Sequence, residues 1–301
     1  MRITVTGGTG TLGQALVREL SERGDEVTVL SRNAERAASS LGVEGQAWKD
    51  PKGEPPPLDS LRDRDAVVHL LGETVAQRWS EDVKREIRDS RILSTRQLVS
   101  ALDQLPQAER PRVLVSQSAT GFYGPHNDER LTEEAPAGDD FLALIVRDWE
   151  AEAQKAGELG LRVVLTRTGV VLSDGGGALE KMLPFFKVGI GGPVAGGKQY
   201  VPWIHLDDVA GAVVACLDGE LSGPVNVTAP EPVTNKELSK MLGKVLKRPA
   251  LAPIPALAVK TLYGEMATIV TTGQRVVPER LEQSGYRFRQ PHLEAALRAS
   301  V

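Results

Sequence analysis

Three regularly spaced glycines, Gly7, Gly10 and Gly13, lie near the start of the chain between an apolar run and a helical pattern. Glycine allows a backbone to turn tightly and to approach a pyrophosphate closely, and the N-terminus of a helix offers unpaired N–H groups to an anion. These residues therefore predict a site for the phosphates of a nucleotide. The predicted contact residues are Thr6, Gly7, Gly10, Thr11, Leu12 and Gly13.

The residues around these glycines predict the elements that would position them. Residues 3–5 are apolar, as in a buried strand, Gly24 is placed to end a helix, and residues 27–30 have the composition of a second strand. The helix between them has one apolar face, made by Leu12, Leu16, Val17 and Leu20. This order of strand, turn, helix and strand favours a dinucleotide-binding unit over a structural turn without a ligand.

The end of the second predicted strand bears on the choice of cofactor. In dinucleotide-binding folds an acidic residue at this place binds the adenosine ribose, whereas an arginine accommodates a 2′-phosphate. Here the strand ends in Ser31 and Arg32, without a carboxylate. A guanidinium binds phosphate through paired, charge-assisted hydrogen bonds. We therefore predict NADP(H) rather than NAD(H); the alternative is that Arg32 is an ordinary surface arginine.

The wider pattern predicts an α/β protein with a doubly wound parallel sheet. Long helical patterns cover residues 80–102 and 141–156, and a proline-rich surface loop covers residues 51–57. Strand-like apolar runs alternate with helical segments, as a parallel sheet covered by helices requires. These runs are Ile3–Val5, Val27–Leu30, Ala66–Leu71, Val113–Val115 and Val163–Leu165.

After Thr168 the chain becomes rich in glycine turns, at residues 175–177, 189–192 and 196–197. We expect loops of a substrate lobe here, closing over the site. The predicted domains are discontinuous: a nucleotide-binding domain of residues 1–168 and 203–228, and a lobe of residues 169–202 and 229–301.

Composition excludes several classes of partner. The chain has 301 residues and a formal net charge of −4, with acidic and basic residues interspersed, so neither nucleic acid nor a membrane surface is predicted. No apolar run approaches the roughly 20 residues that span a bilayer. The single cysteine, Cys216, and the absence of a leader pattern suit the cytoplasm, and the four histidines have no metal-ligand spacing. We expect a small-molecule substrate.

Several motifs together resemble the extended short-chain dehydrogenases/reductases, and more narrowly their atypical "epimerase family" branch. The resemblance covers nearly the whole chain. It implies a Rossmann-type domain, a nicotinamide cofactor across the carboxyl ends of the strands, and a short family-specific terminal segment at residues 249–296. The motifs include Thr6-Gly7-x-x-Gly10-x-x-Gly13, His69-Leu70-Leu71-Gly72, Ser116–Tyr123, Ser90-Arg91, Trp149-Glu150, Trp203-Ile204-His205, Gly223-Pro224-Val225-Asn226 and Gly273-Gln274-Arg275.

The resemblance also implies where the site residues lie. Leu70, Leu71, Gly72 and Glu73 would follow a strand beside the cofactor, and Ser118 would lie near the nicotinamide and bind the substrate. The implied function is that of an oxidoreductase or epimerase-like enzyme acting on a small, nucleotide- or sugar-linked substrate.

The usual catalytic pair of this superfamily is missing. That chemistry needs a tyrosine and, four residues later on the same helix face, a lysine whose charge stabilises the phenolate. Neither residue type occurs between Gly124 and Gln154. If Glu150 matches the glutamate that often follows the pair, Leu142 and Val146 occupy the two catalytic positions, and aliphatic side chains cannot transfer protons.

Several replacements remain open as proton donor: Tyr123, His205 or water. Both side chains also have a structural alternative, Tyr123 as a packed aromatic residue and His205 as a hydrogen-bonded residue before a helix that Asp207 would cap. Positive charge near the site would come from Arg147, or from Arg78, Lys84 and Arg91, which equally suit a solvated surface. The rival function is a non-catalytic NADP(H)-binding redox sensor or regulator. A monomer and a homodimer are both compatible with the sequence.

Overall fold

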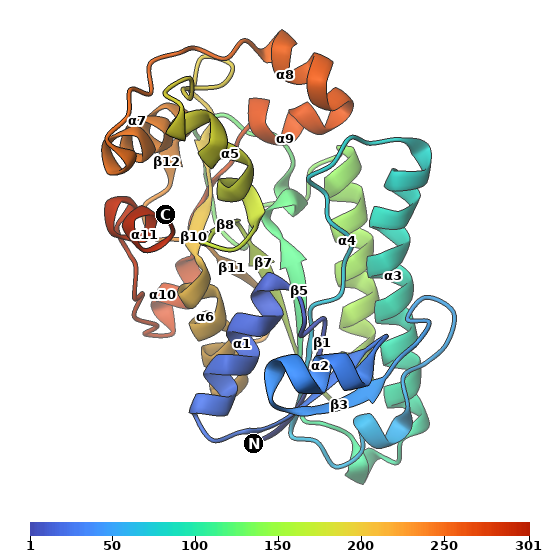
Figure 1. Cartoon of the computed structure of the whole chain (residues 1–301). Helices are drawn as coiled ribbons and strands as arrows, with labels where there is room; N and C mark the ends of the chain where they lie inside the picture. Colours follow the sequence, from blue (N-terminus) through green and yellow to red (C-terminus); the bar gives the residue numbers. More distant parts are fainter.

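A parallel sheet of seven strands forms the centre of the computed structural model, which describes residues 1–301 (Figure 1). Its strands are β1 (Arg2–Thr6), β2 (Glu26–Ser31), β3 (Glu44–Ala47), β4 (Ala66–His69), β5 (Val113–Ala119), β7 (Arg162–Thr168) and β11 (Gly223–Val227). Their spatial order is β11-β7-β5-β4-β1-β2-β3, and every neighbouring pair is parallel. The winding therefore reverses between β1 and β4, and ligands of open α/β sheets bind at such a point.

Helices cover both faces of this sheet. α1 (Thr11–Glu22), α2 (Ala34–Leu41) and α6 (Leu206–Asp218) pack on one face, whereas α3 (Glu81–Gln104) and α4 (Phe141–Gln154) lie side by side on the other. Successive side chains of a strand point to opposite faces of the sheet. In β4, Val68 therefore packs in the core under α1 and α6, and Val67 packs in the core under α3 and α4. Burial on both sides explains why these strands are continuous apolar runs in the sequence.

Side-chain caps set the beginning of the two helices on the second face. Ser80 Oγ accepts the N–H of Val83 at the start of α3, and Asp140 Oδ1 accepts the N–H of Ala143 at the start of α4. Such caps satisfy N–H groups that have no partner inside the helix. α1 differs, because its N-cap is Gly10 and no side chain caps it. Its first-turn N–H groups are therefore free for a ligand.

A smaller lobe lies beyond the carboxyl ends of the strands (Figure 1). Its buried side chains form a separate core, which includes Leu172, Phe186, Trp203 and Leu238. The lobe consists of β8 (Val170–Leu172), α5 (Gly177–Lys187), β9 (Tyr200–Val201), β10 (Trp203–His205), β12 (Val233–Thr234), α7 (Asn235–Leu246), α8 (Ala256–Tyr263), α9 (Thr268–Thr271) and α11 (Leu293–Ala299).

Short elements complete the chain. They pair or connect the larger ones: β8 with β10, β9 with β12, and β6 with β13. Their bounds are β6 (Arg130–Leu131), β13 (Arg275–Val276), α10 (Glu279–Gln283), η1 (Leu58–Ser60), η2 (Gln107–Glu109), η3 (Thr120–Tyr123), η4 (Lys155–Gly157) and η5 (Gly264–Ala267).

The predicted doubly wound α/β fold is confirmed, with three local differences. β3 was not predicted, because this half-exposed edge strand has the sequence Glu-Gly-Gln-Ala and carries no apolar signal. β4 ends at His69 rather than Leu71, because the next residues leave the sheet toward α3. Gly177 begins helix α5, where glycine content had suggested only a loop.

No helix of the protein combines the length and the apolar character that crossing a membrane requires. Cys216 is buried in α6, and burial raises the pKa of its thiol to about 12. No group of three or more His, Cys, Asp or Glu side chains is arranged to hold a metal ion. The domain boundaries given above stay a prediction.

Candidate functional site

The predicted phosphate cradle is a tight turn between β1 and α1 in which glycine is required. Gly7 has a φ of +71°, and a Cβ there would lie 3.0 Å from the carbonyl carbon of Leu70. A Cβ on Gly13 would lie 2.3 Å from Gly7 O and 2.5 Å from Gly8 Cα. A Cβ on Gly10 would meet no protein atom closer than 3.5 Å. Gly7 and Gly13 let the turn close, whereas Gly10 leaves open space where an anion would approach α1.

The lobe contacts this cradle through one of its glycine-rich loops. Thr11 Oγ1 donates a hydrogen bond to Gly175 O at 3.3 Å, so residues 175–177 lie against the start of α1. Residues 189–197 run instead beside the segment before α8, where Ile254 N–H donates to Pro193 O. The expectation that all three glycine-rich turns cover the site is therefore corrected: only residues 175–177 reach the cradle.

The end of β2 carries a free guanidinium. Arg32 is exposed, and its neighbours interact with one another instead: Asn33 N–H donates to Ser31 Oγ, and Asn33 Oδ1 caps α2 by accepting the N–H of Arg36. No carboxylate lies between the end of β2 and the start of α2. This arrangement fits a 2′-phosphate, which needs an unpaired cation at this place.

The loop after β4 is held beside the cradle by a buried histidine. His69 Nδ1 lies 2.8 Å from Thr6 Oγ1, and its Nε2 lies 3.1 Å from Thr95 Oγ1 on α3. Complete burial lowers the pKa of His69 to about 3, so the ring is neutral and ties β1, β4 and α3 together. Leu70 N–H donates to Thr6 Oγ1, which places residues 70–73 next to the glycine turn.

Arg91, on α3, also holds the loop of residues 70–73 in place. A Cβ on Gly72 would lie 3.0 Å from the guanidinium carbon of Arg91. Arg91 Nη2 donates to Glu73 O at 2.9 Å, while Ser90 Oγ accepts the N–H of Glu73. The loop 70–73 is therefore anchored to α3 at Glu73 and to β1 at Leu70.

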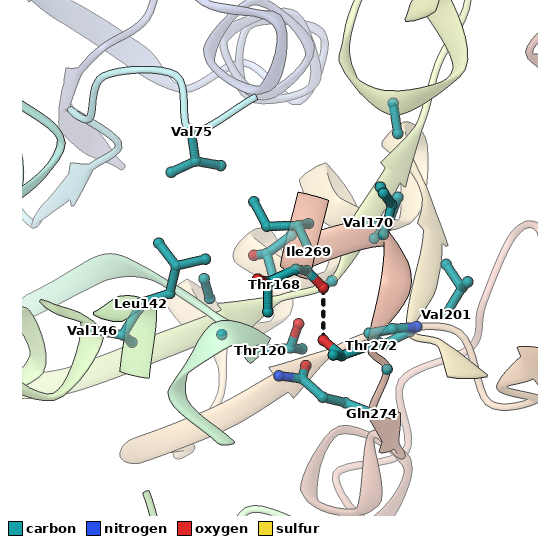
Figure 2. A pocket seen from close by; sticks show the side chains of 18 of the residues that line it. Val75, Thr120, Leu142, Val146, Thr168, Val170, Val201, Ile269, Thr272 and Gln274 are labelled. Carbon is teal, nitrogen blue, oxygen red and sulfur yellow. Dashed lines mark hydrogen bonds between the residues drawn. The ribbon is translucent and has the colours of Figure 1, made fainter. Parts of the chain in front are cut away.

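A cavity of about 540 Å³ opens between the sheet domain and the lobe. Figure 2 shows its walls, with Val75 from the loop after β4, Thr120 from η3, and Thr272 and Gln274 from the segment after α9. Leu12 belongs both to the cradle and to this cavity. The two predicted features, phosphate cradle and substrate space, are thus continuous.

The positions of the missing catalytic pair face this cavity. Leu142 and Val146 lie one turn apart on α4, and both side chains line the cavity (Figure 2). With Glu150 matched to the family's glutamate, two aliphatic groups therefore line the cavity at the positions of the tyrosine and the lysine. Arg147 is exposed and pairs with Asp148, so it supplies no charge here.

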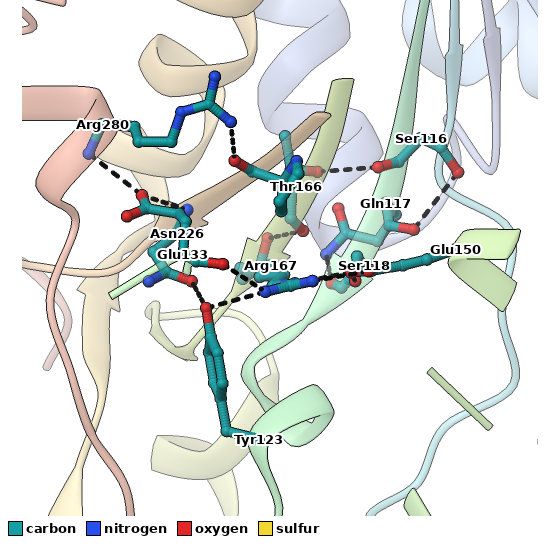
Figure 3. Close-up of polar contacts among 12 residues, drawn as sticks. Ser116, Gln117, Ser118, Tyr123, Glu133, Glu150, Thr166, Arg167, Asn226 and Arg280 are labelled. Carbon is teal, nitrogen blue, oxygen red and sulfur yellow. Dashed lines mark hydrogen bonds and ion pairs between the residues drawn. The ribbon is translucent and has the colours of Figure 1, made fainter. Parts of the chain in front are cut away.

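Ser118 lies where the sequence predicts it, at the end of β5 in the cavity wall. Its Oγ donates to Glu150 Oε1 at 2.5 Å (Figure 3). Glu150 forms a two-pronged ion pair with Arg167, with 2.8 Å from Nε to Oε1 and 2.8 Å from Nη2 to Oε2. All three side chains are buried. The Ser118 hydroxyl is therefore oriented by a buried charge pair.

Tyr123 does not reach the cavity. Its side chain is completely buried, its hydroxyl donates to Asn226 Oδ1 at 2.6 Å, and it accepts from Arg167 Nη1 at 3.1 Å (Figure 3). Burial raises the pKa of Tyr123 above its usual value, which further disfavours the phenolate. This geometry corrects the expectation that Tyr123 donates a proton to the substrate and supports its structural alternative.

His205 is also a structural residue in this arrangement. It lies outside the cavity wall and is 5% exposed, and its Nδ1 accepts the N–H of Asp207 at the start of α6. The cap of α6 is thus His205 rather than Asp207. This contact agrees with the structural alternative for His205, and a role of His205 as proton donor stays a prediction. Asp208 instead is buried and accepts the Tyr286 hydroxyl and the N–H groups of Arg289 and Gln290.

The positively charged side chains predicted near the site interact with other groups of the protein. Arg78 donates to carbonyl oxygens of Thr261 and Leu262, and Lys84 pairs with Glu265 at 2.6 Å. Arg91 alone of the three lines the cavity.

Sequence reasoning missed Arg167, which organises the buried network of Figure 3. Arg167 is 4% exposed on β7, with its guanidinium 3.4 Å from the centre of the Phe122 ring. Burial opposes its charge, but the hydrogen bonds and the charge of Glu150, together with Tyr123, outweigh this and raise the pKa of Arg167. The available signal was an arginine inside an apolar strand run, which requires a buried partner.

This combination of a glycine cradle at the reversal point of a parallel sheet and a cavity beside it defines a Rossmann-type dinucleotide-binding protein. The chain belongs to the NAD dependent epimerase/dehydratase family, whose model matches residues 3–228. Residues 254–300 match a domain of unknown function, DUF1731. The predicted resemblance to the extended short-chain dehydrogenases/reductases and their epimerase-family branch is confirmed.

Individual relatives agree with this assignment. The chain is 39% identical over 309 residues to "Epimerase family protein SDR39U1 homolog, chloroplastic" of Arabidopsis thaliana, covering 99% of this chain and 86% of the relative. It is 37% identical to the human "Epimerase family protein SDR39U1", with complete coverage of both chains. A crystal structure of the human protein with NADPH superposes with a TM-score of 0.88 at 36% identity, covering 99% of this chain and 98% of that one. Because one relative is chloroplastic, a cytoplasmic location stays a prediction.

Proposed function

We propose that this protein binds NADP(H) and acts as an oxidoreductase or epimerase-like enzyme on a small molecule in the cavity. The observation that carries the proposal is the continuity of cradle and cavity at Leu12, with Ser118 in the same cavity wall. The human relative crystallised with NADPH supports the choice of cofactor. When bound, this cofactor supplies or receives a hydride.

Each part of the chain has a proposed role in this function. The turn at Gly7, Gly10 and Gly13 and the free N–H groups of α1 hold the pyrophosphate, Arg32 with Ser31 holds the 2′-phosphate, and residues 70–73 lie along the cofactor. Ser118 orients the substrate oxygen. Because Leu142 and Val146 replace the proton-transfer pair, we propose that the proton is exchanged with water.

The role of Arg32 gives a direct prediction. Replacing Arg32 by alanine removes a charge-assisted contact to the 2′-phosphate, and we expect NADPH affinity to fall by about tenfold or more. NADH lacks this phosphate, so its affinity should change by less than about twofold. Titration of protein fluorescence with both cofactors measures the two values. Arg36→Ala, a change on the outside of the adjacent α2, is the control. Equal weakening for both cofactors would show that Arg32 does not bind the 2′-phosphate.

Catalysis is tested by mixing the NADP⁺-loaded protein with a panel of alcohols and following the absorbance of the NADPH that forms. For an alcohol that is oxidised, Ser118→Ala removes the oxygen that accepts the substrate hydroxyl and should lower kcat/KM by about tenfold, the value of one lost hydrogen bond. Ser116→Ala, two residues earlier on β5 and outside the cavity wall, should leave it unchanged.

A second candidate function, a non-catalytic NADP(H)-dependent regulator, is favoured by the aliphatic pair Leu142 and Val146. It predicts tight NADP(H) binding with no reduction of NADP⁺ by any alcohol of the panel. The two functions therefore differ in turnover but not in cofactor binding. Light scattering would decide between a monomer and a homodimer in either case.

A further inference from the structure

The hydroxyl groups in the cavity wall direct their protons into the protein. Thr272 Oγ1 donates to Thr268 O at 2.7 Å, the contact drawn in Figure 2, and Thr168 Oγ1 donates to Thr166 O at 3.2 Å. Ser118 Oγ donates to Glu150, whose carboxylate can only accept. A hydroxyl has one proton and two lone pairs. Each of these three oxygens can therefore only accept a hydrogen bond from a ligand.

The amide side chains in the wall have the same polarity. Gln117 Nε2 donates to Ser118 O at 3.1 Å, and Gln274 Nε2 donates to Gly124 O at 2.8 Å. A carbonyl oxygen cannot donate, so these contacts determine which end of each amide is the NH₂ group. Gln117 Oε1 is buried without any partner. This oxygen has almost no accessible surface, so a ligand in the cavity does not reach it, and the amide acceptor that the wall offers is Gln274 Oε1.

The charges of the wall are unfavourable for an anion. Arg91 is the only lysine or arginine among the lining residues, and its guanidinium donates to Ile87 O and Glu73 O while lying over the Trp149 ring. Asp140 and Glu265 add carboxylates. Hydrophobic residues make up slightly more than half of the lining, which favours a ligand with an apolar part.

The remaining polar groups are compatible with this polarity. The hydroxyls of Thr120, Tyr200 and Thr268 have no partner in the protein and can accept as well as donate. Asn235 is the exception, since its Oδ1 accepts the N–H of Val194. Acceptors thus outnumber committed donors in the wall.

We propose that the cavity binds an uncharged alcohol or polyol with an apolar body, whose hydroxyl groups donate to Ser118, Thr272 and Gln274. A carboxylate or a phosphate offers only acceptors at neutral pH and is disfavoured, which separates this site from one for a nucleotide-linked sugar. The inference rests on the proposed function in one respect: the cofactor occupies the end of the cavity beside Leu12, and the alcohol occupies the rest.

The test uses three probes of equal size, benzyl alcohol, benzaldehyde and benzoate, titrated into the NADPH-saturated protein and followed by nuclear magnetic resonance. We expect benzyl alcohol to bind at least tenfold more tightly than the other two, which lack a hydrogen-bond donor. Equal or tighter binding of benzaldehyde or benzoate, or no binding of benzyl alcohol, would overturn the proposal.

Two threonines provide matched variants. Thr272→Val removes an acceptor from the cavity wall at nearly constant volume. It should lower the affinity for benzyl alcohol at least threefold and leave the affinity for benzaldehyde unchanged. Thr271→Val removes a hydroxyl that donates to Ala267 O outside the cavity wall and should change neither. An identical effect of both variants would contradict the assignment. Cofactor binding is measured first: if NADPH does not bind, the proposed function fails, and the order of the probes on the free protein still tests the polarity of the wall.

Discussion

Replacing Gly13 by alanine is expected to abolish measurable NADPH binding and to destabilise the protein. The new Cβ would lie 2.3 Å from Gly7 O and 2.7 Å from Gly8 C, and both are backbone atoms that cannot rotate away. The turn must therefore move relative to α1. Overpacking of this kind costs about 2 to 3 kcal/mol of unfolding free energy. The moved turn would also lose its charge-assisted hydrogen bonds to the pyrophosphate. A loss of about 3 kcal/mol lowers the affinity for NADPH by roughly 100-fold.

Gly10→Ala separates binding from stability at the same turn. A Cβ at Gly10 meets no protein atom within 3.5 Å, and its φ of −78° suits alanine. We expect a stability loss of about 1 kcal/mol or less, typical of alanine at an N-cap. The methyl group would stand in the space of the pyrophosphate, so NADPH affinity should still fall by at least about tenfold.

Gly157→Ala serves as the control for both variants, because its Cβ would have no neighbour within 4 Å. Urea unfolding and a fluorescence titration with NADPH give the two quantities for each protein. If Gly10→Ala bound NADPH as tightly as the unchanged chain, the cradle would not be the phosphate site.

Replacing Arg167 by methionine is expected to lower the free energy of unfolding by about 3 to 5 kcal/mol, because it removes one partner of a buried ion pair. The substitution leaves the Glu150 carboxylate, 5% exposed, without its counterion. It also removes the donor to the Tyr123 hydroxyl and to Glu133 O. A buried charge without a partner is far more costly than the pair itself.

Two comparison variants define the cause of this loss. In the double variant Arg167→Met with Glu150→Gln both charges of this pair are removed and neither is left without its partner, so the loss should be clearly smaller than for Arg167→Met alone. Arg85→Met breaks the exposed pair with Asp82 and should cost no more than about 0.5 kcal/mol. Urea unfolding of the three variants gives the free energies. A loss below about 1 kcal/mol for Arg167→Met would mean that water reaches Glu150.

The local features of this protein follow from short stretches of sequence. The apolar run before Gly7, the glycine spacing and the apolar face of the next helix are all contained in the first 20 residues, so strand, turn and helix are read from neighbours along the chain. The same holds for Arg32, which follows β2 directly. The absence of tyrosine and lysine from residues 124–154 is likewise a property of one segment.

Contacts between distant segments could not be read in this way. β3 pairs with β2 although its residues show no strand pattern, because its partner strand and α2 supply the contacts. The glycine-rich residues 189–197 suggested a cover for the site, yet they pack beside residues 249–254. Tyr123 follows Ser118 closely along the chain, but η3 turns its ring into the interior toward Asn226 on β11.

The sequence by itself determined the nucleotide cradle, the doubly wound sheet and the loss of the catalytic pair, because each depends on residue types at short spacing. Only the tertiary structure decided that Ser118 is oriented through Glu150 by Arg167, that Tyr123 and His205 bond to other protein groups outside the cavity wall, and that the cavity wall presents acceptors. The physical reason is that a side chain's free donor or acceptor depends on which distant backbone group satisfies its other atoms. That pairing arises only when strands, η3 and the lobe come together.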